Sequence, residues 1–286
     1  MDADGGNQRN VSDQPGPDVR PAWSPDSRMI AFKSYPGRQS DIYVVDADGS
    51  ARQNITNHPT GDDAQPAWSP DGESIAFVSW RDGAYDIYVM NADGTNPRCL
   101  SSHKGEPSAP TWSPDGKRIA SHVHNPKRDI HVVDVDGGNQ RNITNHPAFD
   151  VKPRWSPDGE SIAFYSRRDG VMDVFVMDPD GANQRNLTNT DDPQGVAGAT
   201  WSPDGKKMAF VPFAKDANPI HVIDADGRNH RVVVPRSEGG VAWSSDGQKI
   251  AFTSRRDGHL AVHVVDVDGQ NERALTGRRG EEERPE

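Results

Sequence analysis

The sequence predicts an all-β fold, a six-bladed β-propeller with four antiparallel strands per blade, and three observations support this. The string Trp-Ser-Pro-Asp (once Trp-Ser-Ser-Asp) recurs every 42 to 46 residues along the 286-residue chain. Short β-branched and aromatic segments follow each copy, and Asp-Gly turns separate these segments. A repeat of this length, made of short strands, is typical of a propeller blade. The motif tryptophans are Trp23, Trp68, Trp112, Trp155, Trp201 and Trp243.

The second repeat shows how each element follows from its residues. A proline-glycine turn ends the first strand, and two Asp-Gly turns separate the later ones. The strand residues are β-branched and aromatic, as pleated surfaces favour. The strands are expected at 67–69, 74–79, 86–90 and 98–101. Sequons at Asn10, Asn54, Asn142 and Asn186 fall on the repeated fourth strand, so we interpret them as part of the repeat.

The two ends of the chain both resemble the end of a repeat. Residues 2–12 and residues 268–276 each read as a third turn followed by a fourth strand. Six blades therefore have seven candidates for a fourth strand, and one terminal strand is expected to close the ring. We predict a single propeller domain over residues 1–276, followed by a charged, disordered tail at 277–286.

Composition excludes several classes of function. The formal charge of −11 disfavours binding to nucleic-acid phosphates. No apolar run is long enough for membrane insertion, and no signal peptide is visible at the N-terminus. The one cysteine, Cys99, excludes an internal disulfide and a multi-cysteine zinc site. We expect a monomer.

The repeat resembles a known family. The segments Ala-Trp-Ser-Pro-Asp-Gly, Ile-Ala-Phe-x-Ser, Asp-Ile-Tyr-Val-Met, Asp-x-Asp-Gly and Arg-x-Leu-Thr are similar to the TolB-like, WD40-like (PD40) propeller repeat over residues 1–276. The resemblance implies a protein that binds partners of the bacterial envelope and a periplasmic or secreted location.

One face of the blades is the better candidate for binding. The Ser-Pro-Asp-Gly and Asp-x-Asp-Gly turns are nearly uniform, whereas the second turns and the connections between blades vary in size and charge. Variation on a constant frame indicates a binding face. Interface anchors favour Trp, Tyr and Arg. The predicted partner-binding residues are Tyr35, Trp80, Arg81, Asp82 and Arg168.

Acidic residues recur five positions before the motif tryptophans. Asp18, Asp63, Asp150 and Glu238 occupy this position, and rotational symmetry brings equivalent positions together near a propeller axis. Clustered carboxylates suit a hard cation, so Ca2+ in the central channel is one hypothesis, and a hydrated acidic rim is the other. TolB-like propellers accommodate calcium in this channel, which the resemblance makes relevant.

Three functions remain open at this point. The leading hypothesis is a non-catalytic scaffold that binds a protein or peptide, because no Gly-x-Ser-x-Gly nucleophile motif occurs. The second is a metal-dependent, lyase-like carbohydrate-active enzyme that uses His122 and His124, since TolB-like propellers of polysaccharide lyases hold metal with histidine. The third is a structural or engineered propeller without an evolved ligand.

Overall fold

The computed structural model describes residues 6, 9–12, 17–35, 37, 39–100, 105–190, 192–213, 218–255 and 258–276. The predicted tail at 277–286 and residues 2–5, 7 and 8 of the N-terminal strand candidate lie outside the described residues. In the described parts of the chain, no helix has the length and hydropathy needed to span a membrane.

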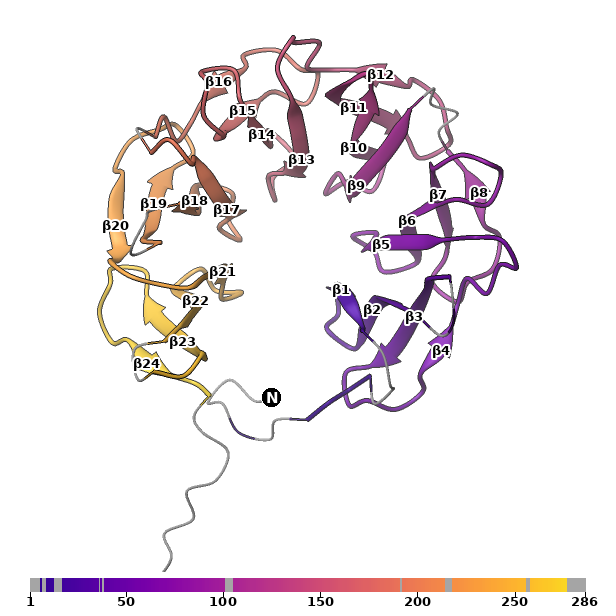
Figure 1. Ribbon diagram of the computed structural model, residues 1–286, viewed down its shortest axis with the longest axis horizontal. Coiled ribbons are helices and arrows are strands. Elements are labelled where there is room, and N and C mark those ends of the chain that lie inside the picture. Colours follow the sequence, from indigo (N-terminus) through magenta and orange to yellow (C-terminus); the bar gives the residue numbers. More distant parts are fainter. Residues whose placement is uncertain are drawn as a thin grey trace, which may run out of the picture. The chain divides into compact units, whose positions relative to one another are not determined.

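The fold is all-β, as predicted, and consists of six propeller blades that are each a four-stranded antiparallel sheet (Figure 1). Blade 1 comprises β1 (Val19–Trp23), β2 (Met29–Ser34), β3 (Asp41–Asp46) and β4 (Gln53–Asn54). Blade 2 comprises β5 (Asp63–Trp68), β6 (Ser74–Ser79), β7 (Asp86–Asn91) and β8 (Arg98–Cys99). Blade 3 comprises β9 (Glu106–Trp112), β10 (Arg118–Asn125), β11 (Lys127–Asp134) and β12 (Arg141–Asn142).

The remaining three blades repeat this order. Blade 4 comprises β13 (Asp150–Trp155), β14 (Ile162–Ser166), β15 (Asp173–Met177) and β16 (Arg185–Asn186). Blade 5 comprises β17 (Val196–Trp201), β18 (Lys207–Pro212), β19 (Ile220–Asp224) and β20 (Arg231–Val234). Blade 6 comprises β21 (Gly239–Trp243), β22 (Lys249–Ser254), β23 (Ala261–Asp266) and β24 (Arg273–Ala274).

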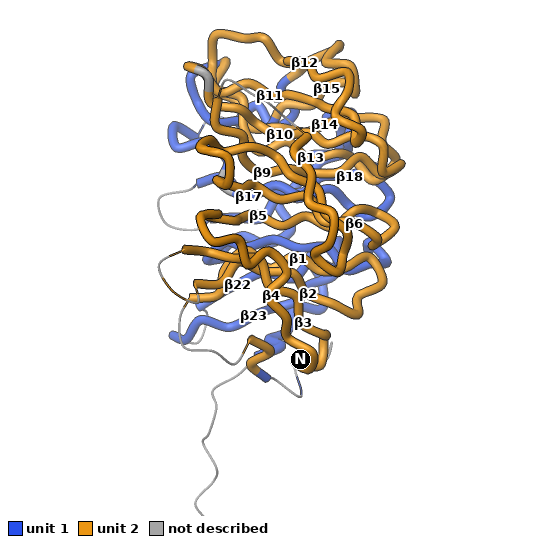
Figure 2. The backbone as a smooth tube through the Cα atoms, turned by 90° about the vertical axis from the view of Figure 1, so that its right-hand side faces the viewer, with its two compact units in different colours: residues 1–9, 169–174, 186–286 blue, residues 10–168, 175–185 orange. Residues whose placement is uncertain are grey.

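The chain divides into two compact units (Figure 2). Unit 2 holds residues 10–168 and 175–185, which include blades 1 to 3 and most of blade 4. Unit 1 holds residues 1–9, 169–174 and 186–286, which include blades 5 and 6. Within unit 2 the first strands of successive blades contact one another, so that β1, β5, β9 and β13 follow side by side.

Three motif tryptophans donate a hydrogen bond to the preceding blade. The indole Nε1 of Trp68 donates to the Ala22 carbonyl at 3.1 Å, and that of Trp112 donates to the Ala67 carbonyl at 2.9 Å. Trp243 makes the same bond to Thr200 in unit 1. In each of these three bonds the acceptor is the residue immediately before the previous motif tryptophan. Trp155 is the exception, because its buried Nε1 has no hydrogen-bond partner among the described residues.

The rings of these tryptophans are part of the apolar core between blades. Trp68, Trp112 and Trp155 are between 7% and 9% exposed and belong to clusters that contain residues of two consecutive blades. Trp23 of blade 1, in contrast, is 56% exposed. Burial of such a large ring against a neighbouring sheet is a main source of blade-to-blade stability.

Two turns also pack between blades. A Cβ atom on Gly72 or Gly159 would lie 3.6 or 3.5 Å from the Cδ of Pro25 or Pro114, the proline of the preceding Ser-Pro-Asp turn. Two third-turn glycines, Gly94 and Gly181, contact the end of the preceding blade more closely. A Cβ on Gly94 would lie 2.5 Å from the Ile55 carbonyl oxygen. The Asp-Gly turns therefore serve packing as well as chain reversal.

The sequon residues stabilise the fourth strand. Asn54 donates from Nδ2 to Asp41 at 2.9 Å, and its Oδ1 accepts from the backbone N–H of Thr56 at 3.1 Å. The Thr56 Oγ1 accepts from the N–H of Ile42 on β3 at 2.9 Å. Blades 3 and 4 repeat this Asp-Asn-Thr arrangement. This confirms that the sequons at Asn54, Asn142 and Asn186 have a structural role in the repeat.

The terminal segments have separate positions. The C-terminal candidate forms β24, the fourth strand of blade 6, and Thr276 Oγ1 accepts from Val262 N–H at 2.9 Å. In the N-terminal candidate, Val11 packs on the Ile30–Phe32–Tyr43–Val45 cluster of blade 1. Its Cα lies 3.5 Å from where a Cβ on Gly49 would stand. Val11 thus contacts Gly49 as Ile55 contacts Gly94.

One expected boundary was wrong. The first strand of blade 2 begins at Asp63 rather than at residue 67, because a bulge at Gln65 carries the pairing past Pro66. The second turn of blade 3, at residues 125–128, is the tight end of a long hairpin. There Asn125 pairs with Lys127 and β10 and β11 each extend over eight residues.

Replacing Trp112 by Phe should lower the free energy of unfolding by about 2–3 kcal/mol, because the variant loses the bond to the Ala67 carbonyl and part of the buried ring. Trp23→Phe is the control, with an expected change below about 0.5 kcal/mol since its ring is exposed. Urea unfolding of both variants measures the difference, and equal losses would contradict a dominant inter-blade role.

Gly94→Ala and Gly83→Ala separate packing from backbone strain, since both glycines have φ +85°. No atom lies within 4 Å of a Cβ on Gly83. Gly83→Ala should lower the free energy of unfolding by about 1 kcal/mol, because only the left-handed backbone conformation opposes it. Gly94→Ala should cost about 3 kcal/mol or more, because the methyl group meets the Ile55 carbonyl. Thermal unfolding of the pair tests this, and similar midpoints would show that the close approach relaxes freely.

Candidate functional site

A polar pocket opens on unit 2 where blades 1, 2 and 3 meet. Its volume is about 320 Å³. It lies at the end of the blades where the second turns and the connections between blades emerge, which is the face that loop variation indicates as the binding face. Blades 1 and 2 contribute Lys33, Asp62, Gln65, Val78 and Tyr85, and blade 3 contributes Glu106, Ser108, His122, His124 and Arg128.

One wall of the pocket is built around Asp62. Its carboxylate accepts a hydrogen bond from the Ser40 hydroxyl and one from the Tyr85 hydroxyl at 3.3 Å. Burial by itself would raise the pKa of Asp62, but the Ser40 hydrogen bond and the charge of Lys33 outweigh it and lower the pKa. Burial and the Asp62 charge raise the pKa of Tyr85. At neutral pH this wall therefore presents a carboxylate, an ammonium and a neutral phenol.

The opposite wall is built on blade 3. Arg128, His124 and Glu106 are register partners across β11, β10 and β9, so their side chains form one row. His122 lies two residues before His124 on the same face, as the sequence predicts. Burial, together with the charges of Arg128 and Lys152, lowers the pKa of His122 to about 4.

The neutral imidazole of His122 has a defined partner in the next blade. The backbone N–H of Lys152 donates to its Nδ1 at 3.4 Å, which leaves the ring proton on Nε2. Gln65 has the same relation to blade 3, because its Oε1 accepts from the N–H of Ala109 and its amide bonds to Ser108 Oγ. Each of these side chains thus reaches from one blade to the first strand of the following blade.

The acceptor atoms of Gln65 and His122 both bond to a bulge that recurs in the first strands. The register shifts in β1, β5, β9 and β13, and the residue three before each tryptophan has a positive φ of 53° to 59°. These residues are Arg20, Gln65, Ala109 and Lys152. Left-handed backbone is unfavourable for side chains other than glycine, and bulges of this kind are common beside functional sites. The bulge therefore helps to shape the pocket.

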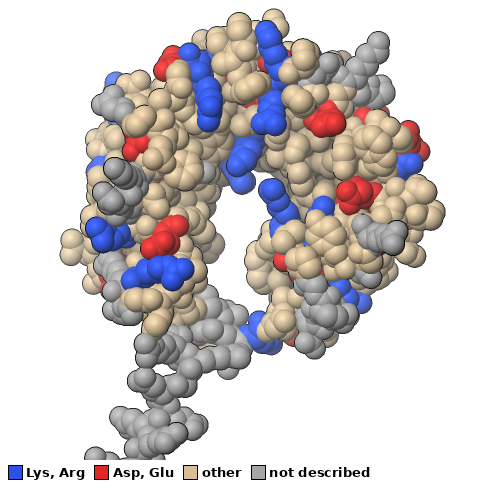
Figure 3. Space-filling view, in the orientation of Figure 1, with Lys and Arg blue, Asp and Glu red and all other residues tan. Residues whose placement is uncertain are grey.

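Three exposed aromatic rings contact residues of the pocket lining. Tyr35 is 39% exposed and Trp80 is 41% exposed. The Trp80 ring meets Tyr85 edge-on at 4.9 Å, and Lys33 Nζ lies 4.8 Å from the Tyr35 ring centroid. Phe149, 48% exposed, lies 5.8 Å from the Arg128 guanidinium. On the face seen in Figure 3, basic and acidic side chains are interspersed. The pocket lining also holds both charges, since it includes Lys33 and Arg128 as well as Asp62 and Glu106.

Two predicted partner-binding arginines instead pair with two predicted cation ligands. Arg81 Nη2 lies 3.2 Å from Asp63, and Arg168 Nη2 lies 2.8 Å from Asp150. Both carboxylates are fully buried, and the arginine side chains are only 9% and 12% exposed. The Arg81 guanidinium is also 4.7 Å from the Tyr88 ring centroid. A buried pair of this kind costs several kcal/mol to break, so these four residues connect strands within their blades.

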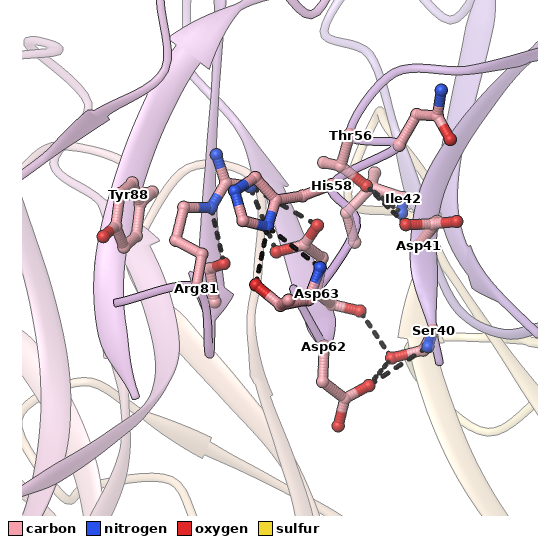
Figure 4. A network of polar contacts seen from close by, with 12 residues as sticks. Ser40, Asp41, Ile42, Thr56, His58, Asp62, Asp63, Arg81 and Tyr88 are labelled. Carbon is pink, nitrogen blue, oxygen red and sulfur yellow. Dashed lines mark hydrogen bonds and ion pairs between the residues drawn. The ribbon is translucent and has the colours of Figure 1, made fainter. Parts of the chain in front are cut away.

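The Asp63–Arg81 pair belongs to a polar network at the junction of blades 1 and 2 (Figure 4). The Ser40 hydroxyl donates to Asp62 and, at 2.9 Å, to the Asp63 carbonyl oxygen. Asp41 lies beside it, and its pKa is raised by burial and by the nearby charge of Asp63. The network holds the connection from β4 to β5 in place and thereby positions Asp62 in the pocket wall.

The other predicted residues have separate surroundings. Asp82 is exposed and accepts a hydrogen bond from Tyr88, and Asp18 is half-buried with no hydrogen bond to its Oδ2 in the described structure. Glu238 is exposed and lies 3.9 Å from Arg255. Among the described residues, no three His, Cys, Asp or Glu side chains gather as a metal site would require. The calcium hypothesis stays a prediction.

Sequence reasoning did not identify several residues of the pocket. Lys33, Gln65 and Tyr85 lie within ordinary strand and loop patterns, and only the fold brings them to one place. One signal of the bulge existed in the sequence, because Gly240 stands three residues before Trp243 and has a φ of +63°. Glycine at that position indicates a backbone conformation that other residues avoid.

Comparison with known proteins agrees with the repeat pattern. The family model described as TolB beta propeller domain (PD40) matches residues 1–121, 98–191 and 171–286. The Tol-Pal system protein TolB of Thioalkalivibrio sulfidiphilus (strain HL-EbGR7) is 45% identical over 56 residues, which are 20% of this chain and 13% of that protein. The chain thus matches only a small part of the length of this curated relative.

Solved structures show the same fold. TolB from Acinetobacter baumannii superposes with a TM-score of 0.65 at 25% identity, covering 86% of this chain and 63% of that one. An oligogalacturonate lyase in complex with manganese superposes with a TM-score of 0.73 at 13% identity, covering 88% of this chain and 74% of that one. At such low identity the second match shows the fold alone.

His122→Gln should make the protein less sensitive to acid. The folded-state pKa of His122 is lowered from its ordinary 6.5 to about 4, so the unfolded chain binds the proton first and stability falls as pH drops from 6.5 towards 4. Between pH 7.5 and 5, His122 should account for about 2 kcal/mol of the loss. Urea unfolding at both pH values compares the two proteins, and an equal loss in the variant would contradict this assignment.

Proposed function

Because the chain belongs to the TolB β-propeller domain (PD40) family, we propose that it is a non-catalytic scaffold that binds a protein or peptide in the pocket between blades 1, 2 and 3. The observation that supports the proposal most is the combination of a polar pocket with an exposed aromatic rim. Aromatic anchors around charged and hydrogen-bonding groups are typical of protein recognition.

The walls of the pocket suit an extended peptide. Asp62 and Glu106 can accept hydrogen bonds from a peptide and form ion pairs with its basic groups. Lys33 and Arg128 can donate hydrogen bonds to the carbonyl and carboxylate oxygens of the peptide. Trp80 and Tyr35 offer apolar surface with few rotatable bonds, which lowers the entropy cost of binding. A partner with alternating polar and apolar side chains would match this surface.

The remaining parts of the proposal come from the family. Similarity to a Tol-Pal system protein supports a partner in the bacterial envelope and a periplasmic or secreted location. A calcium ion bound by Asp18, Asp63, Asp150 and Glu238 is a secondary part of the proposal and is not needed for peptide binding. Arg81 and Arg168 already neutralise the carboxylates of Asp63 and Asp150.

A second candidate function uses the same pocket. His122 and His124 stand in it together with Arg128, an arrangement that could bind an acidic sugar. This arrangement favours a lyase-like enzyme as the alternative function.

Panning a random peptide display library on the full chain provides probes whose affinity can be measured by fluorescence anisotropy. Trp80→Ala and Tyr35→Ala should weaken binding of the selected peptides about tenfold, as expected for interface anchors. Leu260→Ala is the matched control, because Leu260 is a 56% exposed apolar side chain in blade 6 and should leave affinity unchanged.

Equal affinity of these peptides for wild type, Trp80→Ala and Tyr35→Ala would place binding elsewhere and overturn the proposed site. Turnover of acidic oligosaccharides in the presence of manganese, lost in a His122→Ala/His124→Ala variant, would replace the scaffold with the enzymatic alternative.

A further inference from the structure

Two histidines face each other on the outer strands of blade 5, away from the pocket. His221 lies on β19, and His230 immediately precedes β20. The Nδ1 atom of His221 and the Nε2 atom of His230 are 2.6 Å apart. The two rings are 4.9 Å apart between centroids and are tilted by 36°. The two nitrogens are hydrogen-bonded to each other through one ring proton at the surface of unit 1.

The pairing follows from the repeat. In blades 1, 5 and 6 the third-strand aromatic position faces the residue just before the fourth strand. In blade 1, Arg52 lies 4.1 Å from the Tyr43 ring centroid, and in blade 6 Glu272 Oε1 lies 3.2 Å from His263 Nδ1. Only blade 5 has histidine at both positions of the repeat.

A buried ring holds the two imidazoles in place. Phe210, which is 1% exposed, lies 5.2 Å from the His221 ring centroid and 5.4 Å from that of His230. His221 is half-buried against Phe210, and a neutral imidazole nitrogen can serve as a metal ligand. The pair is thus preorganised by the fold.

We propose that His221 and His230 form a two-imidazole chelate for a borderline transition-metal dication, with Cu(II) bound most tightly. Imidazole suits copper, nickel and zinc, and the order of divalent affinities puts Cu(II) highest. This site is independent of the proposed peptide pocket.

The spacing of the nitrogens favours one coordination geometry. At a metal–nitrogen bond of about 2.0–2.1 Å, two ligands are about 2.9 Å apart across a right angle and about 3.3 Å apart across a tetrahedral angle. The two nitrogens are 2.6 Å apart and must move apart to bind a metal ion. The right angle of a tetragonal Cu(II) or Ni(II) site requires a smaller increase in this distance than a tetrahedral site does. His230 is exposed and free to supply that movement. No third protein ligand is in place among the described residues, so water completes the coordination.

Titration of the untagged full chain with Cu(II), Ni(II) and Zn(II) salts, with glycine as a competitor, measures the site by calorimetry. His230→Ala should weaken Cu(II) binding at least about tenfold, because the second imidazole then no longer acts at high effective concentration. His259→Ala, which removes an exposed histidine elsewhere in blade 6, should leave affinity unchanged. Electron paramagnetic resonance of the Cu(II) complex should show two coordinated nitrogens.

Cu(II) affinity in His230→Ala equal to that of wild type would overturn the proposal, and so would a spectrum with one protein nitrogen. Zn(II) binding as tight as Cu(II) binding would contradict the tetragonal geometry. Thermal midpoints of all variants show whether they are folded, and His230→Gln provides a second variant that keeps a polar side chain at the position.

Discussion

The bond from the motif indole to the backbone of the preceding blade is the interaction on which the remaining structure depends. Trp68 and Trp112 each bury a large ring and satisfy its N–H with the carbonyl of the residue before the previous tryptophan. Each of these bonds ties a blade to the first strand of the blade before it, and where the bond is missing, at Trp155, the buried ring alone makes the contact. The first strands thereby come side by side, and the pocket exists only because they do.

Local strain and inter-blade hydrogen bonds combine at that pocket. The bulge residues Gln65, Ala109 and Lys152 have positive φ without being glycine. Their backbone is tolerated because side chains of the preceding blade bond to the bulges of blades 3 and 4, as Gln65 does to Ala109 and His122 does to Lys152. His122 is thus a pocket residue and a structural acceptor at once, which explains why its environment keeps it neutral.

Charge is distributed differently inside the blades and at the surface. Asp63 and Asp150 are buried with arginine partners, whereas Asp62 keeps its charge at the edge of the pocket through hydrogen bonds and the nearby Lys33. The sequence pattern alone assigned Asp63 and Asp150 to a cation and Arg81 and Arg168 to a partner. Carboxylates suit a cation and arginines suit a partner protein. In the folded chain, however, the two acids and the two arginines form ion pairs with each other.

The sequence by itself determined the fold class, the number of blades, the turns and most strands, because these depend on short-range patterns that recur six times. It also indicated the variable face and the His122–His124 pair. Tertiary structure decided which side chains meet: Lys33, Asp62 and Tyr85 at the pocket, Arg81 with Asp63, and His221 with His230. A repeat pattern specifies each blade separately, whereas contacts between strands and blades depend on bulges and registers that vary from one repeat to the next.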